Sequence, residues 1–398
     1  MITVLAALLC LALVAWNYFY SRRWDRGVSV GISFSRPATY VGKTFELTEV
    51  IENRKKMPVP VMEIGFRVPI GIRFTDAENT QISDYIYKKD LFALLGMESI
   101  TRKYEMEAAE RGCYDVSQVV CEAPSLLHIY RYRMDCSTKD RIYAYARRVD
   151  VSRIITSVET ILGELESNHK TYEDPFAFAS IREYTIRDPM KTINWKASAR
   201  SGNLMVNTFT SVRSEEIEVC LDVEDSGILK HSPLVEESIS IAASLCEKLM
   251  MAARTVEFRI NIRPTQQEMA EYGHTLKTMD GYTLFPAASG QDRHQSLERF
   301  LTGKMTNRDT VPFADMAFSG SVPPIKKSDS RPAPTSGKSA ENADRVRILI
   351  SKNIDSDWIR EHQQQIDGSC ILVIPHRHGS QRTPVSQGIH CIDWEMKN

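Results

Sequence analysis

The sequence predicts an α+β multidomain protein with an N-terminal transmembrane helix, a β-sandwich and an α/β domain built on a mostly parallel sheet. Three observations predict this fold class. Residues 2–20 carry no charge. Short runs of alternating apolar and polar residues fill positions 28–150. From residue 215 onward, strand-like runs alternate with helix-like runs, which is the pattern of a parallel sheet covered by helices.

The composition is that of a folded protein, with 42% hydrophobic and 25% charged residues among 398. Fifty basic and fifty-one acidic residues leave a formal charge of -1, so we expect no nucleic-acid partner, which would normally require a basic excess. The eight cysteines are scattered, form no CxxC pair and lie mostly inside apolar runs. We therefore expect reduced core thiols in a reducing compartment.

The first segment, residues 1–21, is predicted to anchor the chain in a membrane. The uncharged run Ile2–Tyr20 is helical in composition, and at about 1.5 Å per residue it nearly matches a hydrocarbon core of roughly 30 Å. Aromatic residues gather at its end and arginines follow: Trp16, Tyr18, Phe19, Tyr20, Arg22, Arg23 and Arg26. These flanks predict a single-pass protein of the cell membrane with its bulk in the cytoplasm. A cleaved signal peptide fits less well, because no basic region precedes the run and no A-x-A site follows it.

Residues 28–150 are predicted to form the β-sandwich-like domain. Val28, Val30, Ile32 and Phe34 alternate with polar residues, and turn signals such as Arg36-Pro37 separate the runs. Two packed sheets are the natural way to bury such strands. The interval 83–98 interrupts the pattern with a partly helical composition.

Residues 215–398 are predicted to form the α/β domain. The patterns indicate strands at 217–223, 256–262, 346–350 and 370–374, with helices at 234–253, 291–301 and 357–366. In such sheets, sites lie beyond the carboxyl ends of the strands. Residues 303–344, rich in Pro, Ser, Lys and Gly, are expected to be a flexible insertion. The SGKS stretch within them is no phosphate loop, because Pro332 stands where the motif needs its first glycine.

Between these regions, residues 151–214 contain an unusual concentration of charges around one tryptophan, at 181–204. Asp188-Pro189 predicts the start of a helix over 189–201, and Gly202 predicts its end. Residues 203–210 are expected to return as a strand.

Three interpretations of these charges remain open. In the first, Glu183 and Asp188 pair with neighbouring basic residues while Trp195 fills a junction between domains. In the second, Trp195 and the arginines are anchors of a surface that docks a partner, since these residue types dominate interface hot spots. In the third, Glu183 and Asp188 perform acid–base catalysis in an envelope-related hydrolase, which requires a cleft and shifted pKa values.

The same segment resembles the signature of the bacterial "domain of unknown function 58" family. The matching motifs are R-E-Y at 182–184, Asp188, I-N-W-K at 193–196 and S-A-R at 198–200. An R-G-x-Y element at 111–114 and a final region similar to a von Willebrand factor type A fold extend the resemblance. Arg187 stands where the family has glycine, and Asn194 replaces the usual aspartate. The signature residues in this chain are Arg182, Glu183, Tyr184, Asp188, Trp195, Lys196 and Arg200.

The resemblance implies a role but no defined enzyme. Members of the family look like partners of MoxR-type AAA+ ATPases and frequently of transglutaminase-like membrane proteins. We therefore expect a non-enzymatic scaffold or adaptor that holds no cofactor. The loss of a carboxylate at Asn194 further weakens the catalytic interpretation.

A type A-like domain can also carry a cation site, D-x-S-x-S, after its first strand. Here Asp222 and Ser226 match, but Glu224 occupies the first serine position, so the motif is degenerate for Mg²⁺. A cation-dependent protein-binding module at Asp222 therefore remains an alternative function. A zinc site is another alternative, suggested by Cys370, His376, His378, His390 and Cys391, although the usual paired spacing is missing.

Overall fold

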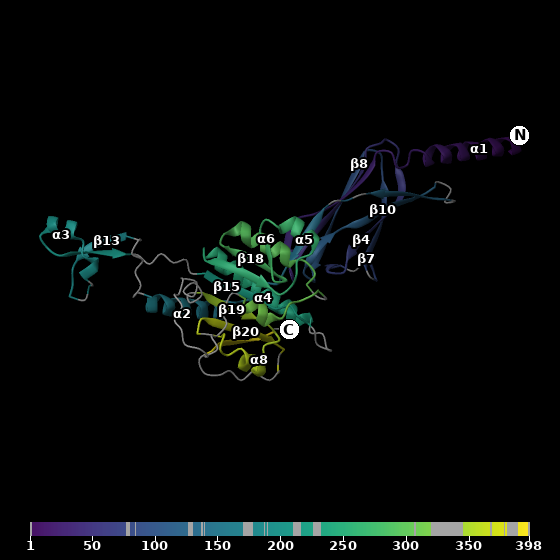
Figure 1. Cartoon of the computed structure of the whole chain (residues 1–398). Coiled ribbons are helices and arrows are strands. Elements are labelled where there is room, and N and C mark those ends of the chain that lie inside the picture. Colours follow the sequence, from purple (N-terminus) through teal and green to yellow (C-terminus); the bar gives the residue numbers. More distant parts are fainter. Residues whose placement is uncertain are drawn as a thin grey trace. The chain divides into compact units, whose positions relative to one another are not determined.

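The structure, a computed structural model, describes most of the chain in two compact units (Figure 1). The described residues are 2–76, 80–83, 85–125, 130–136, 138, 140–169, 178–186, 188, 190–209, 216–225, 232–305, 308–319, 345–366, 368–377, 379 and 389–396. The first unit comprises Met1–Arg148 and Glu298–Lys304, and the second comprises Val149–Leu297 and Met305–Asn398. The predicted mixture of an N-terminal apolar helix, β-rich sheets and a mostly parallel sheet is confirmed.

Helix α1 (Ile2–Ser21) is the predicted N-terminal helix. Its stretch Thr3–Ser21 is long and apolar enough to cross a membrane, and its side chains are almost all exposed. The guanidinium of Arg22 lies 4.9 Å from the ring centre of Tyr18, and that of Arg23 lies 4.3 Å from Phe19. Aromatic and basic side chains thus meet at one end of the helix, as they do at membrane–water interfaces.

The end of α1 is tied into the first unit. The Lys55 ammonium donates hydrogen bonds to the carbonyls of Arg23, at 3.1 Å, and of Trp24. The Trp24 ring is buried and stacks on Tyr132, with ring centres 5.9 Å apart. The lysine thus holds the turn that follows α1 against the first unit.

Three sheets make up the first unit, with strand orders β1-β3-β8-β5, β11-β10-β4-β7-β6 and β2-β12-β9. Their strands are β1 (Val28–Phe34), β2 (Ala38–Tyr40), β3 (Thr44–Asn53), β4 (Val59–Pro69), β5 (Ile72–Phe74), β6 (Thr80–Ile82), β7 (Tyr85–Leu94), β8 (Glu98–Ala108), β9 (Gly112–Asp115), β10 (Ser117–Pro124), β11 (Arg131–Cys136) and β12 (Arg141–Tyr145). One hydrophobic core includes Leu47 of β3, Phe66 of β4 and Met106 of β8, all essentially inaccessible to water. Alternate residues of the first two sheets therefore share a single core.

The partly helical interruption expected at 83–98 is wrong. Residues Tyr85–Leu94 form strand β7, which pairs antiparallel with β4, and β8 begins at Glu98. Ile86, Phe92 and Leu94 are buried, and all lie on one face of β7. The alternation of apolar and polar residues typical of a strand was not visible in the sequence, because the charged residues Lys88 and Asp90 lie on that same buried face.

The R-G-x-Y element has a structural role in the first unit. A Cβ added at Gly71 or Gly112 would come within 1.9 and 2.7 Å of the Tyr114 hydroxyl, so a side chain at either position would have to displace the Tyr114 ring. Arg111 donates to the carbonyls of Leu301 and of Gly303, the latter at 2.7 Å. The element thus holds the segment Glu298–Lys304 in this unit.

The second unit contains a seven-stranded sheet of order β17-β18-β16-β15-β19-β20-β21. Its strands are β15 (Glu216–Leu221), β16 (Thr255–Ile260), β17 (Lys277–Met279), β18 (Tyr282–Ala288), β19 (Val346–Ile350), β20 (Cys370–His376) and β21 (His390–Glu395). The five strands from β16 to β21 run parallel, and β18 is antiparallel to β16. The predicted mostly parallel sheet is confirmed, while the β17–β18 hairpin and β21 were not anticipated.

Helices cover this sheet on both faces. They are α2 (Ser152–His169), α4 (Ser232–Met251), α5 (Gln266–Tyr272), α6 (Gln291–Leu301), α7 (Phe313–Ala317) and α8 (Ser356–Glu361). Cys220, Leu349 and Leu372 share a core with α7 and α8. The neighbouring Val219, Ile348 and Ile371 point to the other face and are also fully buried, and α4 packs on these strands (Figure 1).

The flexible insertion expected at 303–344 is wrong for its first part. Helix α7 lies within it and buries Phe313, Met316 and Ala317. Residues 320–344, which include the SGKS stretch, lie outside the described residues.

Candidate functional site

The signature residues form a small folded frame. Strands β13 (Phe178–Glu183) and β14 (Met205–Phe209) pair antiparallel, and a 3-10 turn η1 (Met190–Thr192) and helix α3 (Trp195–Ser201) connect them. Among its described side chains, those of Ile193 and Val206 are buried, and their backbones form an isolated bridge. A two-stranded hairpin alone is marginal, so polar contacts must contribute to this frame.

The ion pair between Arg182 and Asp188 is the strongest of these contacts. The guanidinium grips both carboxylate oxygens, with N–O distances of 2.6 and 2.7 Å. The backbone amide and hydroxyl of Thr185 each donate to the same carboxylate at 2.8 Å. The Arg182 hydrogen bonds, followed by those of Thr185, hold the pKa of Asp188 well below its usual range. Asp188 is therefore a fixed acceptor and is poorly suited to exchange protons near neutral pH.

Helix α3 begins later than the predicted 189–201. Asn194 caps it by accepting from the backbone amide of Ala197 at 3.0 Å, and its side-chain amide donates to Asn207 at 2.8 Å. Asp188 does not cap the helix because its oxygens bind Arg182 and Thr185. Gly202 ends the helix with φ of 76°, as expected of a left-handed C-cap.

Trp195 does not fill a core. Its side chain is 69% exposed, and the expectation that it fills a junction between domains stays a prediction. Lys196 and Arg200 are neighbours on the surface of α3, and neither is ion-paired to an acidic group in the described part of the chain. The predicted role of Trp195 at an interface with a partner stays a prediction.

The two remaining signature residues take part in the frame. The Glu183 carboxylate accepts a hydrogen bond from the Asn203 side chain at 3.2 Å. The backbone amide of Tyr184 donates to the carbonyl of Leu204 at 2.8 Å. Glu183 and Asp188 thus bind different partners and are not linked as an acid–base pair.

A second candidate site lies at the carboxyl ends of β16, β15 and β19. Asp222 follows β15 and is buried, with both oxygens engaged. One oxygen accepts from the Glu224 amide and Asn261, and the other accepts from Ser351 and Asn353, at 2.5–2.9 Å. Beside it, Lys352 and Asp225 form a buried ion pair of 3.0 Å.

This arrangement does not fit a divalent cation at Asp222. Four protein donors occupy the carboxylate, and a cation would have to replace them. Glu224 contributes its backbone amide and Ser226 lies outside the described residues. Within the described ranges, no three His, Cys, Asp or Glu side chains lie close enough to hold a metal ion. This covers the zinc candidates Cys370, His376, His390 and Cys391, whereas His378 lies outside the described residues. Asn261, Ser351 and Asn353 were missed, although each closely follows an apolar strand.

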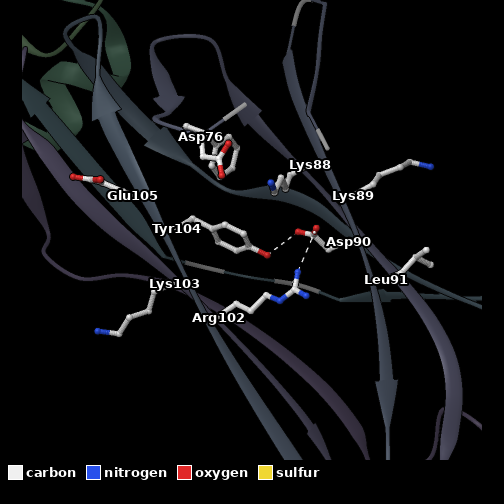
Figure 2. A pocket seen from close by; sticks show the side chains of 10 residues that line it. Asp76, Lys88, Lys89, Asp90, Leu91, Arg102, Lys103, Tyr104 and Glu105 are labelled. Atoms are coloured by element: carbon white, nitrogen blue, oxygen red, sulfur yellow. Dashed lines mark hydrogen bonds and ion pairs between the residues drawn. The ribbon is translucent and has the colours of Figure 1, made fainter. Parts of the chain in front are cut away.

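A third feature is a cavity of about 590 Å³ between β7 and β8 in the first unit (Figure 2). The Tyr104 hydroxyl lies 2.8 Å from Asp90, and Arg102 lies 3.3 Å from the same carboxylate. Lys88 approaches the rings of Phe74 and Tyr104, while Lys89 and Lys103 point away from the centre of the view (Figure 2). The Asp90 carboxylate is thus held by Tyr104 and Arg102, which indicates a structural cluster.

These observations can now be compared with known proteins. The model of the family described as Protein of unknown function DUF58 matches residues 180–375. The match begins in β13 and includes the signature frame and the sheet as far as β20. The uncharacterized protein YeaD of Bacillus subtilis (strain 168) is 21% identical over 231 residues, which are 56% of this chain and 55% of YeaD. The chain thus spans about half the length of this curated relative.

Solved structures match the chain only weakly. The CARDB domain of the PF1109 protein from Pyrococcus furiosus is 15% identical, with a TM-score of 0.18, over 29% of this chain and 90% of that domain. The seventh ScaB type I cohesin from Pseudobacteroides cellulosolvens is 10% identical, with a TM-score of 0.21, over 31% of this chain and 95% of the cohesin. TM-scores this low do not identify a fold, so the fold is described by the strand order of the chain itself.

Proposed function

We propose that the protein is a membrane-anchored, non-enzymatic adaptor that docks a protein partner through residues 178–209. The observation that carries this proposal is a set of large apolar side chains exposed on a small, internally braced frame. Ile186 is 95% exposed, Met190 75% and Trp195 69%. Ile181 and Leu204 of the same frame are also exposed. Apolar side chains gathered in this way typically mark binding surfaces.

Charge indicates what kind of partner fits. Lys191, Lys196 and Arg200 stand on the same frame, and among the described residues none of them is ion-paired. The two acids of the frame are engaged, Asp188 by Arg182 and Glu183 by Asn203. The surface therefore offers apolar groups flanked by free cations, which complements a partner with an acidic rim around an apolar pocket.

The backbone of the frame is already fixed in the absence of a partner. The bidentate Arg182–Asp188 pair, the Asn194 cap and the Ile193–Val206 contact fix its backbone. Fixing a surface in advance reduces the entropy lost on association. The partner that the family resemblance implies is a MoxR-type AAA+ ATPase, with a transglutaminase-like membrane protein as a further component.

The proposed architecture is a β-sandwich followed by a von Willebrand factor type A-like domain. Two sheets of the first unit sharing one core support the sandwich. In the second unit, the order β18-β16-β15-β19-β20-β21 corresponds to the doubly wound order 3-2-1-4-5-6 when β17–β18 counts as the third strand. A domain of this kind without an accessible cation ligand would serve as a rigid support for the docking residues 178–209.

The two alternative functions have less support. A hydrolase would need a titrating pair, but Asp188 is held ionised and Glu183 binds Asn203. A cation-dependent module would need free oxygens on Asp222, and these accept four hydrogen bonds from the chain.

Photocrosslinking from position 195 in native membranes, followed by mass spectrometry, tests the proposal. We expect crosslinks to a MoxR-type ATPase, and W195A should weaken binding of the purified ATPase to the full chain at least tenfold, since anchor residues contribute about 2 kcal/mol or more. M251A is the matched control, because Met251 is 65% exposed on α4. Crosslinks confined to the chain itself, or equal binding by W195A and M251A, would overturn the proposal.

The charge complementarity is tested separately. The double variant K196E/R200E should weaken binding to the ATPase, whereas K277E, on the exposed strand β17, should not. If W195A loses binding but K196E/R200E keeps it, the docking surface is supported, and the hypothesis that the partner has an acidic rim is wrong.

A further inference from the structure

Two cysteines of the first unit lie in contact. Cys121 is in β10 and Cys136 is the last residue of β11, its antiparallel neighbour. The register pairs Val119 with Cys136 and Cys121 with Met134, so the two cysteines share a face two positions apart. Their sulfur atoms are 3.7 Å apart.

The two thiols have different surroundings. Cys121 is fully buried, whereas Cys136 is only half-buried. The Cys121 thiol and the backbone amide of Val30 both hydrogen-bond the Cys136 sulfur. The contact with Cys121 and, more weakly, the Val30 amide lower the pKa of Cys136 against the opposing effect of burial. The more accessible sulfur is therefore the one whose anion is stabilised, as in reactive thiols.

We propose that Cys136 is an oxidation-sensitive thiol and Cys121 its resolving thiol, so that hydrogen peroxide closes a reversible disulfide between β10 and β11. The reaction has two steps. The Cys136 thiolate attacks peroxide, breaking its O–O bond and yielding a sulfenic acid and hydroxide, which takes up a proton to become water. The Cys121 sulfur then attacks the sulfenic sulfur and expels its oxygen as a second water. Overall, two thiols lose two electrons and two protons, and one peroxide becomes two waters.

The fold provides the movement that bond formation needs. A disulfide requires the sulfurs to approach to about 2.05 Å, so one strand must shift toward the other. Strand β11 is at the edge of its sheet, and Cys136 is at its end. Such a shift displaces the end of one edge strand and leaves the pairing of β10 with β4 in place.

Cys391 is an internal control. It is half-buried like Cys136, but burial and, secondly, Asp393 raise its pKa to about 11. At neutral pH its thiolate fraction is small, and we expect peroxide to oxidise it at least about tenfold more slowly than Cys136.

The test uses the full chain in detergent micelles, with C113S as background because Cys113 and Cys121 share the tryptic peptide 112–131. After treatment with hydrogen peroxide and alkylation of the remaining thiols, mass spectrometry should find peptide 112–131 joined to 134–139, and dithiothreitol should separate them. In C121S, dimedone should instead trap a sulfenic acid at Cys136. Oxidation of Cys136 no faster than of Cys391, absence of the joined peptides, or no dimedone adduct in C121S would each overturn the proposal.

Discussion

At the scale of single residues, one hydroxyl lies between two carboxyl groups in the first unit. The Tyr104 oxygen is 2.7 Å from Glu49 and 2.8 Å from Asp90. A phenol has one proton to donate, so Tyr104 can donate to only one of the two carboxyl groups at a time. Burial, above all, raises the pKa of Glu49, and its second oxygen is buried without a hydrogen-bond partner among the described residues. Glu49 therefore holds a proton more tightly in the folded chain than in the unfolded one, and Asp90 lies beside Arg102.

The raised pKa of Glu49 predicts that the stability of the folded chain depends on pH. Because the pKa of Glu49 is raised in the folded state, the folded chain keeps a proton that the unfolded chain releases above about pH 4.3. Stability should fall as pH rises from there through the folded pKa. E49Q carries no titrating proton, so we expect it to raise the melting temperature of the full chain at pH 7.5 and to change it little at pH 4. The measurement is thermal unfolding in detergent across this range, with hydrogen exchange of β3 and β8.

The paired variant D90N is a useful control, since the Asp90 carboxylate lies 3.3 Å from the Arg102 guanidinium. D90N should lower the melting temperature at pH 7.5, because it leaves Arg102 without its counter-ion. Parallel pH profiles for E49Q and the wild type would show that folding leaves the pKa of Glu49 unchanged and would contradict this prediction.

Residue chemistry was predictable from the sequence where it depends on near neighbours. The pairing of Asp188 with a nearby arginine follows from the attraction of opposite charges six positions apart. The exposure of Trp195 did not follow, because burial depends on which surfaces pack together. The four donors around Asp222 come from three strand ends that only the sheet order brings together.

At the scale of elements, two polar residues of the signature could start a helix, and the structure uses the second. Asp188 is occupied by Arg182, so Asn194 caps α3. We expect N194A to destabilise the 178–209 frame by about 1 kcal/mol, because an alanine leaves the first amides of the helix without an acceptor. N194D keeps an acceptor for Ala197 and should cost about half as much or less.

Hydrogen exchange at Ala197 and Ser198 measures this effect directly. The amide of Ala197 donates to the cap and that of Ser198 donates to the Asn194 carbonyl, so only the first should lose protection strongly in N194A. Equal exchange in the wild type and N194A would contradict the capping role.

The strands of the α/β region were predictable because their apolar runs are long. The alternation of residue types did not reveal that the charged residue Glu218 of β15 is also buried. Glu218 is almost inaccessible and pairs with Arg259 at 2.9 Å and with Arg347 at 3.2 Å. Alternation of apolar and charged residues indicates a half-exposed strand only when the charges have no partners across the sheet.

At the scale of the whole molecule, the proposed membrane anchor at α1 would determine on which side of the membrane the other surfaces lie. The apolar helix α1 is followed by Arg22, Arg23 and Arg26, and arginines next to a span favour the cytoplasmic side. The docking frame would then meet cytoplasmic ATPases, and the Cys121–Cys136 pair would stay reduced until an oxidant reaches it. Both proposals therefore depend on the same orientation.

Labelling of Cys113 tests this orientation, because it is one of two exposed cysteines and the other, Cys10, lies within α1. We expect a membrane-impermeant maleimide to modify Cys113 in disrupted membranes and not in intact spheroplasts, with C113S identifying the signal. An N-terminal truncation to residue 27 should move the chain to the soluble fraction, since Thr3–Ser21 is the membrane-spanning candidate among the described helices. Labelling of Cys113 in intact spheroplasts would place the docking frame outside the cytoplasm, where an ATP-driven partner has no nucleotide.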